Sequence, residues 1–212
     1  MSDALDAARA QAWVERFLAV AEAEREALGE LDRLSGDGDY GANLAVAIGH
    51  IYAVLGRDPA SVGDPFGAAS TGFLRTGGTS GPLFGMWFRA FAQAGADRAA
   101  IDLDQLAAAA EEGLAAVRRL GGAEVGDKTM IDALAPAVGA LLAAAGDGAE
   151  LEPALSAAAA AARAGAAATV DLVARRGRAS YVGEVARGVA DPGAVTAALF
   201  FEAASGEPPV TH

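Results

Sequence analysis

Apolar residues recur at intervals of three and four along most of the chain, which is the pattern of amphipathic helices that pack around a core. Trp13, Val14 and Phe17 fall on one helical face of the first segment, and charged residues occupy the others. This pattern predicts a first helix over residues 2–34. We expect it to end at the cluster of helix breakers Ser35-Gly36-Asp37-Gly38-Asp39.

The same periodicity, interrupted by glycine and proline, predicts further helices. They are expected over residues 41–57, 65–74, 82–91, 103–120, 129–145, 152–175 and 192–204. Asp102 and Gln105 have the spacing of a capping box at the start of residues 103–120. Pro136 is expected to kink the helix over 129–145. Strand-forming residues are sparse and no repeat of fixed period is present, so the sequence predicts an all-α fold of roughly eight helices.

Composition agrees with this fold class. Hydrophobic residues make up 53% of the chain and aromatic residues only 6%. Much of the apolar content is alanine, which forms helices best and lets them approach closely. The length of 212 residues fits one domain over 1–212 with a sizeable core. We expect the tail 206–212 to be frayed.

Charge and cysteine content narrow the possible partners. The net charge of −12 argues against a nucleic-acid surface, which needs a basic stripe. The absence of cysteine excludes disulfides and thiolate metal sites and fits a reducing compartment. The N-terminus lacks the features of a secretory signal, and the alanine-rich run before Arg163 is too weakly apolar to span a bilayer. We therefore expect a cytoplasmic protein with neither nucleic acid nor membrane as a partner.

Three aspartates carry the strongest chemical signal. Asp37 and Asp39 flank one glycine in a tight loop, Asp32 precedes them near a helix end, and Asn43 follows. Carboxylates this close repel one another unless cations neutralise them. Mg²⁺ takes oxygen ligands and commonly shares its shell with substrate phosphates. The alternative is an ordinary solvated acidic turn.

Three common ligand-binding motifs match parts of the sequence only incompletely. Residues 36–41 match G-x-G-x-x-G, but the preceding segment is helical and two carboxylates stand where a pyrophosphate would approach. A calcium loop opening at Asp37 would place Ala42 and Ile48 where glycine and glutamate are needed. Residues 121–129 resemble a phosphate-binding P-loop, but Asp127 is inserted before the lysine and no strand precedes.

Further loops could carry chemistry or could be ordinary turns. Residues 77–81 precede a predicted helix, where backbone N–H groups suit phosphate oxygens, and Thr79 and Ser80 add hydroxyl donors. Residues 126–130, 178–181 and 191–193 contain some charge but are not distinctive alone. His50 and His212 are expected to be structural or incidental, so the chain offers no good histidine base and no Ser-His-Asp set.

Taken in order, these loops resemble those of the L-subunit family of dihydroxyacetone kinases. The family pattern L-D-x-x-x-G-D-x-D-H-G-x-N matches Leu31 to Asn43, and G-G-A-S-G-P-L-x-G matches Gly77 to Gly85. Two more matches follow, Gly126-Asp127-Lys128-Thr129-Met130-Ile131-Asp132 and Gly177-Arg178-Ala179-Ser180-Tyr181-Val182-Gly183-Glu184, with Asp191-Pro192-Gly193-Ala194 after them. The resemblance covers nearly the whole chain.

The resemblance implies a closed barrel of about eight antiparallel helices with ADP or ATP bound at one end. Carried over by position, the ligands of two Mg²⁺ ions would be Asp32, Asp37 and Asp39. The residues touching the phosphates would be Tyr40, Gly41, Ala42, Asn43, Thr79 and Ser80. The residues lining the nucleoside site would be Gly121, Met130, Arg178, Asp191, Pro192 and Gly193. No catalytic residue is assigned beyond the metal ligands.

The resemblance also implies a division of labour between subunits. In the family, dihydroxyacetone is bound covalently to a histidine of a separate K subunit, and the phosphoryl donor is either free ATP or a phosphotransferase-system protein. This sequence has Tyr40 and Val189 where the family has histidines. Two alternatives remain: a domain of a fatty-acid-kinase-like enzyme, and a nucleotide-loaded module that signals to a transcriptional regulator.

Overall fold

The chain folds into a bundle of helices in a computed structural model that describes residues 4–181 and 183–205. Its α-helices are α1 (Ala7–Ala23), α2 (Arg25–Ser35), α3 (Tyr40–Tyr52), α4 (Gly63–Leu74), α5 (Ser80–Ala94), α6 (Leu103–Gly121), α7 (Ile131–Gly146), α8 (Leu151–Ala168) and α9 (Pro192–Ser205). Three short 3₁₀ helices lie between α8 and α9, namely η1 (Thr169–Asp171), η2 (Arg178–Tyr181) and η3 (Gly183–Ala186). The predicted all-α fold is confirmed.

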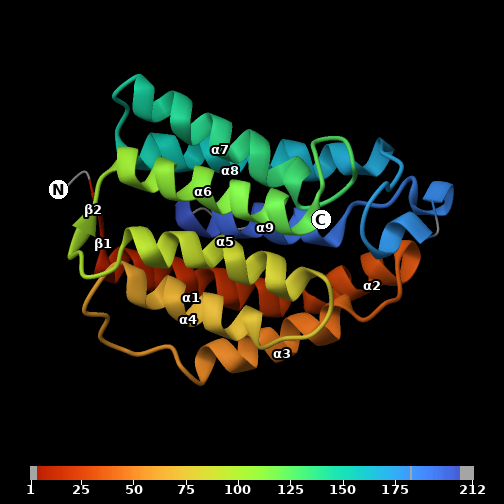
Figure 1. The fold of residues 1–212 in the computed structure, drawn as a ribbon, viewed down its shortest axis with the longest axis horizontal. Helices are drawn as coiled ribbons and strands as arrows, with labels where there is room; N and C mark the ends of the chain where they lie inside the picture. Colours follow the sequence, from red (N-terminus) through yellow and green to blue (C-terminus); the bar gives the residue numbers. More distant parts are fainter. Residues whose placement is uncertain (1–3, 182, 206–212) are drawn as a thin grey trace.

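The helices close into a ring. Neighbours pack in the order α4, α5, α6, α7, α8, α9 and α1, and α1 returns to α4. The pair α2 and α3 extends the bundle beyond α1 and α4, as Figure 1 shows. Only Glu24 separates α1 from α2. Counting these two as one interrupted helix gives the eight helices of the predicted barrel.

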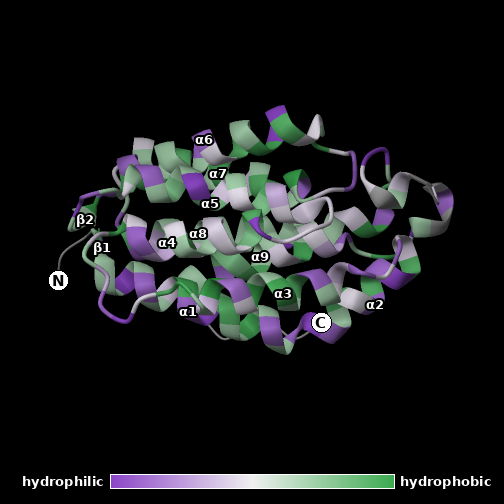
Figure 2. Cartoon of the chain, turned by 60° about the horizontal axis from the view of Figure 1, so that its bottom comes forward, coloured by the Kyte–Doolittle hydropathy of each residue, from purple (hydrophilic) through white to green (hydrophobic). Residues whose placement is uncertain are grey.

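Helix α9 is buried along almost its whole length. Residues 192–204 are all buried, and α9 runs through the middle of the bundle in Figure 1. Phe200 stacks on Trp13 at 4.6 Å between ring centroids and meets Phe88 edge-on at 5.2 Å. The indole N–H of Trp13 donates to the Phe200 carbonyl at 2.7 Å. Figure 2 shows hydrophilic residues both in the connections and as bands along the helices, whose other positions are hydrophobic.

Several predicted boundaries need correction. The predicted helix over 2–34 is two helices, because Glu24 has φ −85° and ψ 0°, which departs from helical geometry. The predicted helix over 41–57 ends at Tyr52. The predicted helix over 152–175 ends at Ala168, where the Thr169 hydroxyl donates to the Ala166 carbonyl and the chain tightens into η1.

Three further features of the fold can be compared with the sequence predictions: the capping box, Pro136 and a pair of short strands. The capping box is confirmed, since the Gln105 N–H donates to the Asp102 carboxylate at 2.9 Å. Pro136 lies inside α7, and the kink expected there stays a prediction. Strand β1 (Leu5–Asp6) pairs antiparallel with β2 (Ala100–Ile101), and two-residue strands are too short to leave a pattern in the sequence.

Four connections meet at one end of the bundle. They are residues 36–39, 75–79, 122–130 and 172–191, and they gather on the right of Figure 1. Among the described residues, no helix combines the length and apolar character needed to cross a bilayer. One domain over 1–212 stays a prediction, and the predicted frayed tail 206–212 lies outside the described residues.

Candidate functional site

A pocket opens to solvent where the four connections meet. It receives residues from each of them and from the first turns of α3, α5 and α9. The lining residues are Asp32, Ser35, Asp37, Asp39, Tyr40, Asn43, Gly78, Thr79, Ser80, Leu83, Lys128, Thr129, Met130, Arg176, Gly177, Ala179, Asp191, Pro192 and Gly193.

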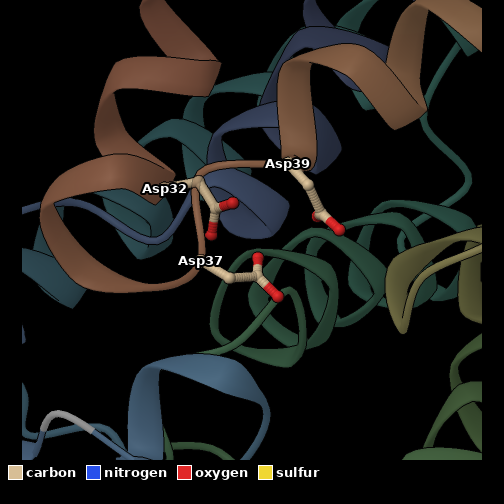
Figure 3. Close-up of side chains that lie close together, drawn as sticks. All are labelled: Asp32, Asp37 and Asp39. Atoms are coloured by element: carbon tan, nitrogen blue, oxygen red, sulfur yellow. The ribbon is translucent and has the colours of Figure 1, made fainter.

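Three carboxylates converge on one side of this pocket. Asp32, Asp37 and Asp39 each offer an oxygen, and these oxygens all lie within 4.8 Å of one another. Figure 3 shows the three side chains extending toward a shared space. Asp32 is buried, whereas Asp37 and Asp39 are exposed. Clustered carboxylate oxygens that face both solvent and an open pocket suit a hard divalent cation such as Mg²⁺.

The protein holds these carboxylates together against their mutual repulsion. Burial raises the pKa of Asp32, and the charges of Asp37 and Asp39 raise it further. The backbone N–H of Tyr40, which donates to Asp32 at 3.0 Å, acts in the opposite direction. A cation at this place would relieve the repulsion and favour the charged form of Asp32.

A tight turn between α2 and α3 brings the aspartates together. The Gly36 N–H donates to the Asp32 carbonyl at 2.5 Å, and a Cβ on Gly36 would collide with the Asp32 carboxylate. Gly38 has φ +78°, a backbone angle that residues with a side chain rarely adopt. Both glycines therefore place Asp37 and Asp39 beside Asp32.

The start of α5 forms the wall next to the aspartates. Thr79 and Ser80 stand at its N-terminus, where backbone N–H groups lack partners within the helix. Asn43 of α3 lies close to Gly78. A Cβ atom on Gly78 would come within 2.9 Å of the side-chain amide nitrogen of Asn43. Uncommitted N–H groups, two hydroxyls and the helix dipole make this wall suitable for phosphate oxygens.

The opposite wall is built around the start of α9. The Asp191 carboxylate caps this helix by accepting the Ala194 N–H at 2.7 Å. Burial raises the pKa of Asp191 to about 7, although the Ala194 N–H and the charge of Lys128 act to lower it. Beside it, Asp132 accepts the N–H groups of Gly126 at 2.5 Å and Thr129 at 2.8 Å. These bonds fix the loop that presents Met130 to the pocket.

Tyr40 contributes mainly to the support of the pocket. It is one of the lining residues, but its hydroxyl donates to the Thr196 hydroxyl of α9 at 2.8 Å. Thr196 in turn donates to the Pro192 carbonyl at 2.8 Å. Burial raises the pKa of the Tyr40 phenol, which keeps it neutral. The chain of hydroxyls therefore ties the first turn of α3 to the first turn of α9.

The structure brings most of the predicted site residues into one pocket. Those that line it are Asp32, Asp37, Asp39, Tyr40, Asn43, Thr79, Ser80, Met130, Asp191, Pro192 and Gly193. Gly41 and Ala42 line a separate shallow depression with Arg25 and Gly29. Gly121 is not among the lining residues and packs near Leu83. The side chain of Arg178, like His212, lies outside the described part of the structure.

Sequence reasoning missed several residues of the pocket. Lys128, Thr129 and Arg176 line it, yet none was assigned a role. One signal was available for Lys128, because it is the only lysine in the chain. Thr129 and Arg176 belong to loops without regular spacing, and only the folded structure brings them together. His50 does not line the pocket, in agreement with its predicted structural role.

Comparison with known proteins now decides the family. The pattern of the DAK2 domain matches residues 35–206. The chain belongs to the DAK2 domain family. The match includes Asp37, Asp39 and all of the later pocket residues, and Asp32 lies just before it.

Two bacterial members of the family are similar along their whole length. The "PEP-dependent dihydroxyacetone kinase 1, ADP-binding subunit DhaL" of Listeria innocua is 36% identical over 193 residues, which are 90% of this chain and 91% of that protein. The "PEP-dependent dihydroxyacetone kinase, ADP-binding subunit DhaL" of Escherichia coli is 37% identical over 189 residues, or 87% of this chain and 89% of that protein.

Longer relatives contain the domain as one part. The dihydroxyacetone kinase of C. freundii, solved in complex with AMP-PNP and Mg²⁺, is 32% identical with a TM-score of 0.70. That comparison covers 94% of this chain but only 34% of the kinase chain. The triokinase/FMN cyclase of Rattus norvegicus is 40% identical over 84% of this chain and 31% of its own. The chain thus spans about a third of these multidomain kinases.

Proposed function

We propose that this chain is the nucleotide-binding subunit of a kinase that transfers a phosphoryl group from Mg-bound ATP to a hydroxyl of a short ketose such as dihydroxyacetone. The observation that carries the proposal is a single pocket with three clustered carboxylates on one wall and the N-terminus of α5 on the next. This pairing serves a metal–polyphosphate ligand. The relatives named as ADP-binding subunits of dihydroxyacetone kinases support the same function.

Each wall has its own task in this proposal. Asp32, Asp37 and Asp39 would hold two Mg²⁺ ions, which when bound neutralise the charge on the phosphates. The N–H groups and hydroxyls of Thr79 and Ser80 would orient the phosphate oxygens. The protein contributes mainly positioning and charge stabilisation, as is general for phosphoryl transfer.

The nucleoside end of the pocket lies on the other side. Met130 supplies an apolar surface, and Pro192 and Gly193 allow close approach at the first turn of α9. Asp191 would keep its role as the helix cap while the nucleoside packs beside it. Arg178, whose position matches the family motif, is proposed to contact the nucleotide as well.

A separate subunit is proposed to hold the ketose. None of the described residues that line the pocket is assigned a contact with a ketose. Exposed apolar side chains lie at the same end of the bundle, at the ends of α2, α4 and α6 and in the loop after α6. They are Leu34, Leu74, Leu120 and Val125, which are 44–60% exposed. Such a rim fits the docking of a K-type subunit that carries the acceptor.

The phosphoryl donor proposed for this subunit is a protein of the phosphotransferase type, with bound ADP recharged in place. Relatives that match this chain over about 90% of both lengths are named PEP-dependent kinases. The longer relatives are named by other activities, such as L-erythrulose 1-kinase. Direct use of ATP is the alternative. A lipid-carrier kinase and a regulatory module gain no support from any named relative.

Binding of Mg-ADP should stabilise the fold. A ligand that binds only the folded state adds about 2.7 kcal/mol at a hundredfold excess over its dissociation constant. For a domain of this size, that corresponds to a rise in melting temperature of about 5–10 °C. ADP without Mg²⁺ should have much less effect, because its phosphates would meet unscreened carboxylates. Calorimetric melting in both conditions checks this, and equal curves would contradict the proposed site.

Charge placed on the apolar rim should separate nucleotide binding from transfer. In Leu120→Glu and Val125→Glu, ketose kinase activity with the partner subunit should fall at least about tenfold, since each variant buries a charge at the interface. The affinity for Mg-ADP should stay unchanged because neither side chain lines the pocket. Titration calorimetry and a coupled kinase assay measure the two properties. Leu142→Glu, which places the same charge at an exposed leucine of α7 away from the rim, is the control.

A further inference from the structure

Lys128 is an unusual residue in this chain. Of the 16 basic residues Lys and Arg, it is the only lysine. It is also almost completely buried, with 1% of its surface exposed, in the wall of the nucleotide pocket. Its backbone has φ +62°, a left-handed conformation that residues other than glycine and asparagine rarely adopt.

The Lys128 ammonium joins two separate parts of the chain. It donates hydrogen bonds to the carbonyl of Thr169, at the end of α8, and to the carbonyl of Val189. The Thr169 hydroxyl accepts the N–H of Asp191 at 2.9 Å. Lys128 therefore binds Val189, two positions before Asp191, and Thr169, which binds the Asp191 backbone.

The loop around Lys128 also anchors the beginning of the 172–191 connection. The Arg175 N–H donates to the Asp127 carbonyl at 3.1 Å. Adjacent residues of one loop thus bind this connection close to its start and close to its end. Among the acidic groups around Lys128, Asp191, Asp132 and Asp171 attract its charge.

Both features of Lys128 cost free energy, so they call for a compensating role. A left-handed backbone at a residue other than glycine is strained. A buried ammonium loses hydration that only good partners replace. Here burial lowers the pKa of Lys128, whereas the neighbouring carboxylates raise it. The partners it gains are backbone carbonyls beside the start of α9, and not a surface carboxylate.

We propose that Lys128 is a positioning residue that holds the turn at Asp191, Pro192 and Gly193 in place and so preforms the nucleoside end of the pocket. This inference rests on the proposed function for the identity of the ligand. The three aspartates belong to α2 and the turn at 36–39, whereas the hydrogen bonds of the Lys128 ammonium go to Thr169 and Val189. Loss of the ammonium should therefore weaken binding of the nucleoside part and spare binding of metal and phosphate.

Lys128→Met tests this division, because methionine keeps an unbranched apolar stem and removes the donors. Titration calorimetry would compare Mg-ADP with Mg-pyrophosphate, and Mn²⁺ binding would report on the aspartates. Mg-ADP affinity should fall at least about tenfold, the scale seen when residues that orient ligand contacts are lost. Affinities for Mg-pyrophosphate and Mn²⁺ should stay unchanged. An unchanged preference for ADP over pyrophosphate would overturn the proposal.

Leu141→Ala provides the control for a general loss of stability. Leu141 is fully buried in α7 but does not line the pocket. This variant should lower the melting temperature and leave the preference for ADP over pyrophosphate unchanged. If it shifts that preference as much as Lys128→Met does, the effect is one of stability and the proposal fails.

Trypsin digestion tests the same inference without any ligand. Arg175, Arg176 and Arg187 are cleavage sites in the connection that Lys128 anchors. Lys128→Met should be cut faster at these sites than the unmodified protein, while Leu141→Ala should not favour them. Equal rates and sites in all three proteins would overturn the anchoring role. If the unmodified protein digests as expected but does not bind Mg-ADP, only the proposed function fails.

The unmodified protein offers a measurement that does not depend on a variant folding. Because the chain has one lysine, ¹⁵N-lysine labelling gives a single side-chain ammonium signal. Two carbonyl partners and burial should slow its hydrogen exchange enough for the signal to be seen at neutral pH. Rapid exchange typical of a solvated lysine would show that the ammonium is not held between Thr169 and Val189.

Discussion

Asp37→Asn and Asp39→Asn should each weaken the binding of Mg-ADP by about 2–4 kcal/mol, the range for breaking a close contact between charges. That loss corresponds to roughly 30- to 1,000-fold in dissociation constant. Both side chains are exposed and belong to the carboxylate cluster. Each substitution removes one charge from the metal site with almost no change in shape. Titration calorimetry in the presence of Mg²⁺ measures the effect, and EDTA should reproduce it in the unmodified protein.

Asp32 is a poorer choice for this test because it has a second role. Its carboxylate accepts the Tyr40 N–H at the start of α3, so its loss would also disturb the turn. Asp58→Asn is the control, since Asp58 is also exposed, belongs to the connection after α3 and lies outside the pocket. Retention of full affinity in both Asp37→Asn and Asp39→Asn would rule out the cluster as the metal site.

The parts of the site that the sequence predicted are those governed by local rules. The helix breakers at 36–39 predicted the end of α2, and the glycines at 77–78 predicted a break before α5. Residues from both places line the same pocket. Asp102 and Gln105 marked the start of α6 correctly. In each case the residues that decide the structure are neighbours in the chain.

The parts that could not be predicted depend on contacts between distant residues. No helix breaker marks Glu24, yet α1 ends beside it. Helix α8 ends at Ala168, although no glycine or proline stands there to end it. The carbonyl of the next residue, Thr169, accepts a hydrogen bond from the Lys128 ammonium, which belongs to a distant loop. The Tyr40 hydroxyl could equally have faced the pocket. Instead it donates to the Thr196 hydroxyl, 156 residues away, a contact that only the folded chain creates.

The chain alone should not phosphorylate dihydroxyacetone at a useful rate, even when Mg-ATP is supplied. Transfer requires the acceptor hydroxyl in line with the phosphate and at near-attack distance. Such pre-organisation is worth about 7–11 kcal/mol, or at least about 10⁵-fold in rate. Within the described residues the pocket supplies carboxylates and helix N-termini, which serve a metal–phosphate ligand, and the histidine His50 does not line it. We therefore expect the acceptor site to be supplied by the proposed partner subunit.

A K-type subunit added to the chain should restore transfer and make it sensitive to the aspartates. Coupled measurement of ketose-dependent product formation would compare the chain alone, the partner alone and the mixture, with either ATP or a phosphorylated phosphotransferase-system protein as donor. In the mixture, Asp37→Asn should abolish turnover, and Asp58→Asn should preserve it. Because neither variant alters Leu120 or Val125 of the proposed docking rim, a loss of turnover reports on the metal site and not on assembly. Robust ketose-dependent turnover by the chain alone would place the acceptor site in this subunit and refute the proposed division of labour.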